Sequence, residues 1–398
     1  MYSKLSIFIL LVLTGFEVVA QNSVSLHRQD PNRKVITTAV PFLNFAPDSR
    51  HAAMGDAGVA TSPDANSAQW NAGKLAFIEE DFGFSLSYSP WLGNIMPDMS
   101  LVYLTGYRKI NDLSAFGFDL RYFDMGSVLL TDGRGNQLGN FNPRDMALGG
   151  TYSRKLSNNL SLGISARFIH SNLSGHVNAA GGSEGRPGMS VGTDIGIYYT
   201  TRDIYYPDKV VWSWGANISN IGPKITYNSA EDLDYLPTNL RLGTAVEIPF
   251  RELNKITFAL DVNKLMVPTP PLYAENADGS LVTGPDGRPV IAAGKDPSRP
   301  MFSGMFGSFS DAPGGFSEEL QEVMVSLGIE YSYNNAFALR SGYFVENPNK
   351  GNRRYLTAGV GFAYKGIGFD FSYLMPLDQN HPLAETLRFT LSYNVGGR

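Results

Sequence analysis

The chain has 398 residues, no cysteine, and a formal net charge of −5 from 32 Lys and Arg against 37 Asp and Glu. The acidic excess argues against a nucleic-acid partner, which requires a basic surface, and the lack of cysteine excludes disulfides and thiolate metal sites. Forty-two glycines and 12% aromatic residues favour strands and turns over helices.

The first eighty residues show three sequence patterns. Residues 1–20 carry Lys4 before an apolar run and small residues, Val18 and Ala20, at the cleavage positions, so we expect a signal peptide and Sec export. Residues 21–34 are polar without periodicity, which indicates a flexible tail. Residues 35–80 are rich in Pro, Gly and Ala and do not alternate, so we treat them as a separate compact segment.

From residue 81 to residue 398 the sequence alternates with a period of two. Phe82, Phe84 and Leu86 alternate with Gly and Ser, which is the pattern of a strand with one apolar and one small polar face. About fourteen such segments start near residues 82, 100, 114, 144, 160, 190, 210, 239, 255, 322, 336, 355, 366 and 384. Each is long enough to cross a bilayer as a tilted strand.

The connections between these segments are alternately short and long. This alternation is typical of an up-and-down membrane barrel with tight turns on one rim and long loops on the other. We therefore predict an all-β fold, a transmembrane antiparallel β-barrel of about 14 strands in the outer membrane. A secreted β-sandwich or propeller is the alternative. Charged residues on the polar faces are expected to point into the lumen: Asp119, Arg121, Arg167, Asp194, Arg241, Glu247, Asp261 and Arg388.

The largest connection, residues 264–321, contains an apolar cluster. The cluster lies among Gly and Ser and consists of Met301, Phe302, Met305, Phe306, Phe309 and Phe316. An exposed apolar cluster on a loop usually marks a binding surface or a plug. The alternative is that the cluster folds back onto its own barrel rim.

Chemical motifs do not indicate an enzyme. Residues 188–192 match G-x-S-x-G, but a glycine-rich loop precedes the serine and a strand follows it, where the motif requires a strand and then a helix. The five histidines are scattered, without the spacing of a zinc site. We expect no catalytic residue, no cofactor and no metal.

A family resemblance rests on AVPFLNFAPDSRHAAMGDAGVATSPDANSAQWNAGKLAF, residues 39–77, followed by FGFSLSYSPWL, residues 82–92. Together they resemble the PorV (LptO) family, outer-membrane barrels of the type IX secretion system of Bacteroidetes. The shorter core resembles FadL-like barrels, in which an N-terminal segment plugs a fourteen-stranded barrel. The resemblance assigns these residues to a plug, within residues 35–80: Pro47, Asp48, Met54, Gly55, Gly58, Trp70 and Asn71. Ala72 stands where a proline usually follows, so we expect a looser plug turn.

The resemblance implies a role in secretion without catalysis. Such a protein would dock at an SprA-type translocon and bind the C-terminal signal domain of exported cargo. It would then deliver the cargo to the PorU-type sortase attachment complex, while outer-membrane lipid surrounds its barrel. We expect the cargo or translocon contacts among Phe302, Met305, Phe306, Phe309 and Trp91. The alternatives are a FadL-like transporter of hydrophobic small molecules and an open porin.

Overall fold

The computed structural model describes residues 34–92, 96, 98–131, 134–173, 186–202, 209–227, 233–277, 279–378 and 386–396. The expected signal peptide, residues 1–20, lies outside the described residues. The expected tail, residues 21–34, lies outside them except for Lys34.

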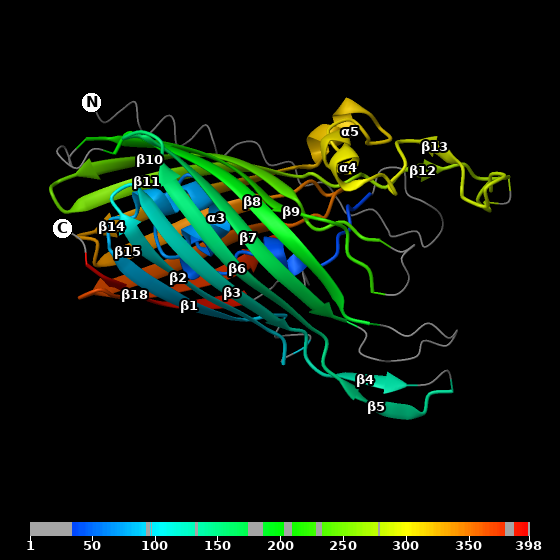
Figure 1. Ribbon diagram of the computed structural model, residues 1–398, viewed down its shortest axis with the longest axis horizontal. Helices are drawn as coiled ribbons and strands as arrows, with labels where there is room; N and C mark the ends of the chain where they lie inside the picture. Colours follow the sequence, from blue (N-terminus) through cyan, green and yellow to red (C-terminus); the bar gives the residue numbers. More distant parts are fainter. Residues whose placement is uncertain are drawn as a thin grey trace.

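Fourteen antiparallel strands of the described chain form one closed barrel, in which each strand pairs with the next barrel strand along the chain and β18 closes on β1 (Figure 1). The strands are β1 (Phe82–Pro90), β2 (Ser100–Asn111), β3 (Ser114–Asp124), β6 (Arg144–Lys155), β7 (Leu160–Asn172), β8 (Gly188–Thr200), β9 (Val211–Ile221), β10 (Asn239–Phe250), β11 (Asn254–Leu265), β14 (Val323–Tyr333), β15 (Phe337–Val345), β16 (Arg354–Tyr364), β17 (Ile367–Pro376) and β18 (Thr386–Val395). Every predicted strand start lies within two residues of the observed one, so the predicted barrel is confirmed.

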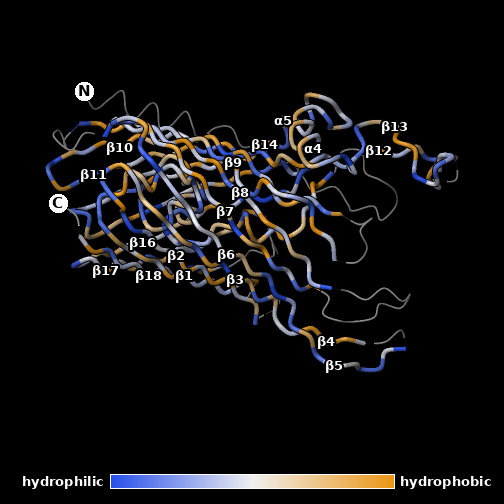
Figure 2. Tube along the Cα trace, in the orientation of Figure 1, coloured by the Kyte–Doolittle hydropathy of each residue, from blue (hydrophilic) through white to orange (hydrophobic). Residues whose placement is uncertain are grey.

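The strand faces follow the predicted alternation. In β1, Phe82, Phe84 and Leu86 are exposed on the outer wall, whereas Ser85 and Ser87 are fully buried inside. Figure 2 shows apolar and polar residues alternating along the strands in the same way. An apolar outer wall of this kind is stable in contact with lipid. Lipid offers the backbone no hydrogen bonds, and a closed ring of strands needs none from it because every strand is paired on both sides. The charged residues predicted to point inward are buried: Asp119, Arg121, Arg167, Asp194, Arg241, Asp261 and Arg388, with Glu247 half-buried.

The two rims of the barrel differ as predicted. β1 begins and β18 ends on the rim with tight turns, such as the two-residue turn between β16 and β17. The other rim carries the long loops with two small hairpins and two helices (Figure 1). These are β4 (Val128–Thr131), β5 (Gln137–Phe141), β12 (Leu272–Tyr273), β13 (Ile291–Ala293), α4 (Met301–Gly307) and α5 (Phe316–Gln321). None of the described helices has the length and apolar character needed to cross a membrane.

Residues 34–80, here called the inner segment, lie inside the barrel (Figure 1). The segment contains η1 (Pro41–Asn44), α2 (Ser49–Ala52), α3 (Ser67–Trp70) and η2 (Ala72–Phe77). Inward-facing strand glycines make room for it. A Cβ on Gly163 of β7 would collide with the backbone of Ala72, and one on Gly342 of β15 would collide with the backbone of Gly55. Glycine in a strand commonly marks such a close backbone approach.

Candidate functional site

Asp48 organises the centre of the inner segment. It caps α2 by accepting a hydrogen bond from the backbone N–H of His51 at 3.0 Å, and it also meets the His51 ring at 2.7 Å. Its second oxygen accepts the indole N–H of Trp70 at 2.7 Å. Burial raises the pKa of Asp48, but the His51 charge and these hydrogen bonds outweigh burial and hold the pKa below its ordinary value. Asp48 and its preceding Pro47 are both buried.

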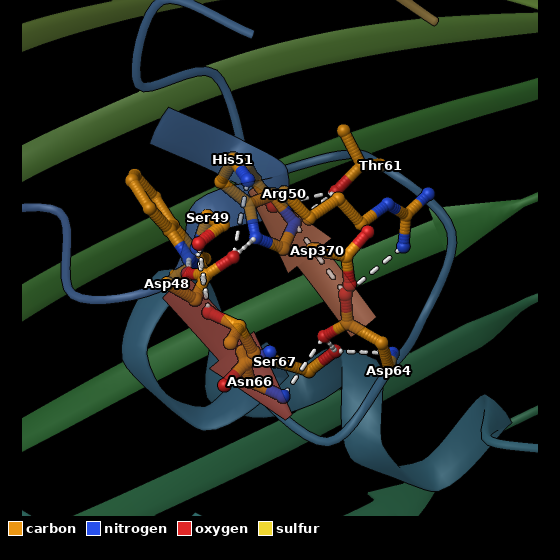
Figure 3. A network of polar contacts seen from close by, with 12 residues as sticks. Asp48, Ser49, Arg50, His51, Thr61, Asp64, Asn66, Ser67 and Asp370 are labelled. Atoms are coloured by element: carbon orange, nitrogen blue, oxygen red, sulfur yellow. Dashed lines mark hydrogen bonds and ion pairs between the residues drawn. The ribbon is translucent and has the colours of Figure 1, made fainter. Parts of the chain in front are cut away.

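His51 also contacts Thr61, so an Asp–His–Thr series resembles a hydrolase triad in outline (Figure 3). The ring Nε2 lies 3.0 Å from the Thr61 hydroxyl. All three residues, Asp48 included, have no exposed surface. A nucleophile has to reach a substrate, so this arrangement acts in packing and not in catalysis.

Arg50 fastens the inner segment to the barrel wall (Figure 3). Its guanidinium pairs with Asp64 of the inner segment at 2.9 Å and with Glu330 of β14 at 3.0 Å. Glu330 also pairs with Arg340 of β15 at 2.6 Å, and Arg340 pairs with Asp370 of β17. Glu330 is buried and the other four ions are partly buried, and all five have partners, so removing one of them leaves a charge uncompensated.

The remaining predicted plug residues also contact the wall or its lining. The backbone N–H of Gly58 donates to Asp261 of β11 at 2.7 Å, and that of Gly55 donates to Thr357 of β16 at 3.0 Å. Met54 is buried among alanines from the inner segment, β10 and β11.

Side-chain hydrogen bonds of Asn71 hold the turn after Trp70, which we expected to be looser. The Asn71 side chain donates to the carbonyls of Val59 and Ile197 at 3.1 and 2.9 Å and accepts the backbone N–H of Gly73 at 3.0 Å. These three bonds hold the turn without a proline.

The long loop places its phenylalanines on the surface. In the part of the loop here called the α4–α5 platform, residues 301–321, Phe302 is 59% exposed, Phe306 64% and Phe316 75%. Phe309 is also exposed, whereas Met305 is only 4% exposed and is part of the packing beneath α4. Met305 is therefore a support and not a surface contact. The sequence places Phe316 in the same apolar cluster, but Phe316 was not among the expected partner contacts.

Buried charges hold the α4–α5 platform against the barrel rim. Lys264, at the end of β11, pairs with Glu319 at 3.0 Å and with Glu322. Lys350 pairs with Glu318 and, at 3.0 Å, with Glu322. All five side chains are buried, so the platform is fixed in place rather than loosely tethered. Sequence reasoning missed this cluster because both lysines are far in the chain from the three glutamates.

Trp91 does not lie on the surface. It is 5% exposed, stacks on Phe45 of the inner segment with ring centroids 4.5 Å apart, and meets Phe123 edge-on. The Arg388 guanidinium lies over its ring. Trp91 therefore packs between the wall and the inner segment, and in this conformation it offers no surface for a partner.

A comparison with protein families matches residues 28–272, more than half of the chain, to the family described as Type IX secretion system protein PorV. A comparison with curated protein sequences gave no significant match.

Solved barrels of other proteins share the fold. The TodX deltaS2S3 mutant monoaromatic hydrocarbon channel is 14% identical with a TM-score of 0.50, over 88% of this chain and 98% of that chain. The CymD monoaromatic hydrocarbon channel is 14% identical with a TM-score of 0.50, over 88% and 97%. A Pseudomonas aeruginosa FadL homologue is 12% identical with a TM-score of 0.43, over 91% and 99%.

The low identities to TodX and CymD limit those likenesses to the fold, a barrel that encloses an N-terminal segment. The family match covers the inner segment and the barrel through β11, and its description names the type IX secretion system. The chain belongs to the PorV family and is an outer-membrane β-barrel protein of the type IX secretion system.

Proposed function

We propose that the protein is a shuttle of the type IX secretion system. It docks at an SprA-type translocon, binds the C-terminal signal domain of exported cargo, and delivers the cargo to the PorU-type sortase attachment complex. Residues 1–20 direct Sec export, residues 35–80 close the lumen, and residues 81–398 form the barrel with its extracellular loops. The shuttle binds and releases and has no catalytic residue of its own.

The observation that carries the proposal is the α4–α5 platform. Phe302 and Phe306 lie one helical turn apart, and both are more than half exposed at the loop rim, outside the lipid-facing wall. Exposed apolar clusters of this kind mark protein-binding surfaces, and aromatic residues supply most of the binding energy at such surfaces. The buried charges below keep the cluster in one geometry, which lowers the entropy lost on binding.

The anchoring of the inner segment to the wall supports binding over conduction. The inner segment is joined to the wall by the Arg50 network and by strand side chains such as Asp261 and Thr357. An open pore would require these bonds to break together. A shuttle binds its partners on the outside of the barrel and on the loops. All bonds between the inner segment and the wall can therefore stay intact.

The test replaces the exposed phenylalanines Phe302, Phe306 and Phe316 with serine in the full-length protein. We expect the variant to insert into the outer membrane normally. Its co-purification with translocon and cargo should fall by at least about tenfold, because each aromatic side chain that a partner covers contributes on the order of 1 kcal/mol or more to binding.

A matched control replaces Val128 and Leu129, which are exposed on the β4–β5 hairpin of another loop, with serine. The control should co-purify as the wild type does. Normal co-purification and cargo display by the phenylalanine variant would remove the α4–α5 platform from the proposal.

A second candidate is the transport of hydrophobic small molecules, as the names of the TodX and CymD channels state for those proteins. A cavity at the loop end of the lumen, partly lined by Trp70, Met324 and Phe344, favours it. Deleting the gene separates the two candidates. Lost surface display with normal uptake of hydrophobic compounds supports the shuttle, and the reverse result supports the transporter.

A further inference from the structure

A cavity of about 310 Å³, here called the rim pocket, lies between the inner segment and the loop ends of β10, β11, β14 and β15. Apolar side chains from both sides line it, among them Ile36, Phe45 and Trp70 of the inner segment. Val35 and Pro41 also line the pocket and are exposed, so solvent reaches it. Its size is at the lower end of the range for small-molecule sites.

Arg241 provides an unused positive donor in the rim pocket. The side chain is 5% exposed, and its Nη1 atom has no hydrogen-bond partner among the described residues. The guanidinium is fixed by the Trp70 ring, 5.1 Å away, and by the Asn239 side-chain amide, which in its preferred orientation accepts from Nε at 3.0 Å. Buried donors are nearly always paired, so a preorganised guanidinium with a free N–H indicates a site for an anionic oxygen.

Two unused acceptors also line the pocket. The Oδ1 atoms of Asp56 and Asn263 are buried and have no partner among the described residues. The other Asp56 oxygen accepts the hydroxyl of Tyr355 at 2.6 Å, which fixes the carboxylate. These acceptors suit a ligand that carries an N–H or O–H donor as well as an anionic group.

The other charged lining residues already have partners. Arg353 pairs with Glu346 at 2.8 Å, and Lys350 pairs with Glu318 and Glu322. The free polar atoms are therefore one cationic donor and two acceptors, one of them anionic, beside an apolar wall.

We propose that the rim pocket binds a free apolar α-amino acid. The carboxylate pairs with Arg241, the ammonium group meets Asp56 and Asn263, and the apolar side chain packs against Trp70 and Phe344. A cavity of about 310 Å³ is at the lower end of the range for small-molecule sites, which suits a compact ligand such as an amino acid. The proposed ligand contacts include no residue of the α4–α5 platform, so this proposal can fail while the shuttle proposal stands.

The test is equilibrium binding of radiolabelled L-leucine to the full-length protein in lipid nanodiscs. We expect saturable binding with a dissociation constant between about a micromolar and a millimolar. Unlabelled L-leucinamide, which lacks the carboxylate, should compete at least about tenfold more weakly than L-leucine, because the charge-assisted contact with Arg241 is lost. 2-Hydroxy-4-methylpentanoate should also compete less well, because it offers Asp56 no positive charge.

Paired variants locate the binding. R241M should weaken L-leucine binding by at least about tenfold. R167M is the matched control, because Arg167 is another buried lumen arginine, pairs with Asp194 and does not line the pocket. R167M should bind as the wild type does, and heat-modifiable gel migration shows whether each barrel is folded. Absent saturable binding in the wild type, equal competition by L-leucinamide, or equal losses in the two variants would overturn the proposal.

Discussion

Lys264 is one of the two buried lysines that anchor the α4–α5 platform. It is buried, and it pairs with both Glu319 and Glu322. Replacing it with Met keeps a long apolar stem but removes the charge. We expect the platform to open more often while the barrel stays intact, because the barrel strands are held by their own hydrogen-bond ladders.

The cost can be worked out from the contacts that remain. Breaking a buried ion pair typically costs about 3–5 kcal/mol. Glu319 would keep two backbone donors, the N–H groups of Asp311 and Ala312 at 2.7 and 2.9 Å. Glu322 would keep Lys350 at 3.0 Å and the Thr269 hydroxyl at 2.6 Å. The loss is therefore at the lower end, about 3 kcal/mol, which corresponds to an increase of about a hundredfold in opening.

Hydrogen exchange of the peptide covering residues 301–321, measured by mass spectrometry in nanodiscs, reports this opening. Lys255→Met is the matched control on the same strand, because Lys255 is partly exposed and approaches Glu247 only to 3.9 Å. Exposed pairs contribute at most about 1 kcal/mol, so the control should exchange in this peptide as the wild type does. Unchanged exchange in Lys264→Met would refute the claim that buried charges hold the platform.

Two further changes probe the inner segment. Gly163→Ala should cost about 1–3 kcal/mol and raise hydrogen exchange across residues 71–77, because the new Cβ meets the Ala72 backbone. Gly150→Ala should leave this exchange unchanged, because a Cβ at Gly150 would lie 3.6 Å from the nearest atom. Equal exchange in the two variants would refute the claim that Gly163 makes room for the inner segment. Burial lowers the pKa of Lys74 to about 8 from 10.5. Between these values the unfolded chain binds more protons, so the free energy of unfolding should rise with pH, by on the order of 3 kcal/mol. Lys74→Met should abolish this rise in denaturant titrations, and an identical pH profile in the variant would contradict it.

The barrel could be predicted from the sequence because lipid imposes a local rule. Each membrane strand has to place apolar side chains on every second position, so Phe82, Phe84 and Leu86 show their orientation without knowledge of any partner strand. The alternation of short and long connections then indicated that each strand pairs with the next one along the chain. Inward charges such as Arg167 and Asp194 follow from the same rule, although their pairing at 2.6 Å does not.

The site was harder to predict because it depends on contacts between distant residues. Met305 and Phe306 are neighbours in α4 and are similarly apolar, yet one is buried and the other exposed, since only the position of the rim decides which face of the helix is covered. Trp91 looked like an exposed loop aromatic until Phe45, from the inner segment, was found stacked on it. The family resemblance indicated an inner segment, but no sequence pattern indicates which strand glycine faces its backbone.

Lys34 joins the inner segment to the long loop, and this contact bears on the choice between shuttle and transporter. Its ammonium group donates to the carbonyls of Pro270 and Pro271 at 3.2 and 2.7 Å, and its backbone N–H donates to Asn349. Transport through the lumen would have to displace a segment held at this end by Lys34 and in the middle by Arg50. Cargo binding on the α4–α5 platform needs neither contact to break. The lower energetic cost of the second process is the physical reason to favour the shuttle.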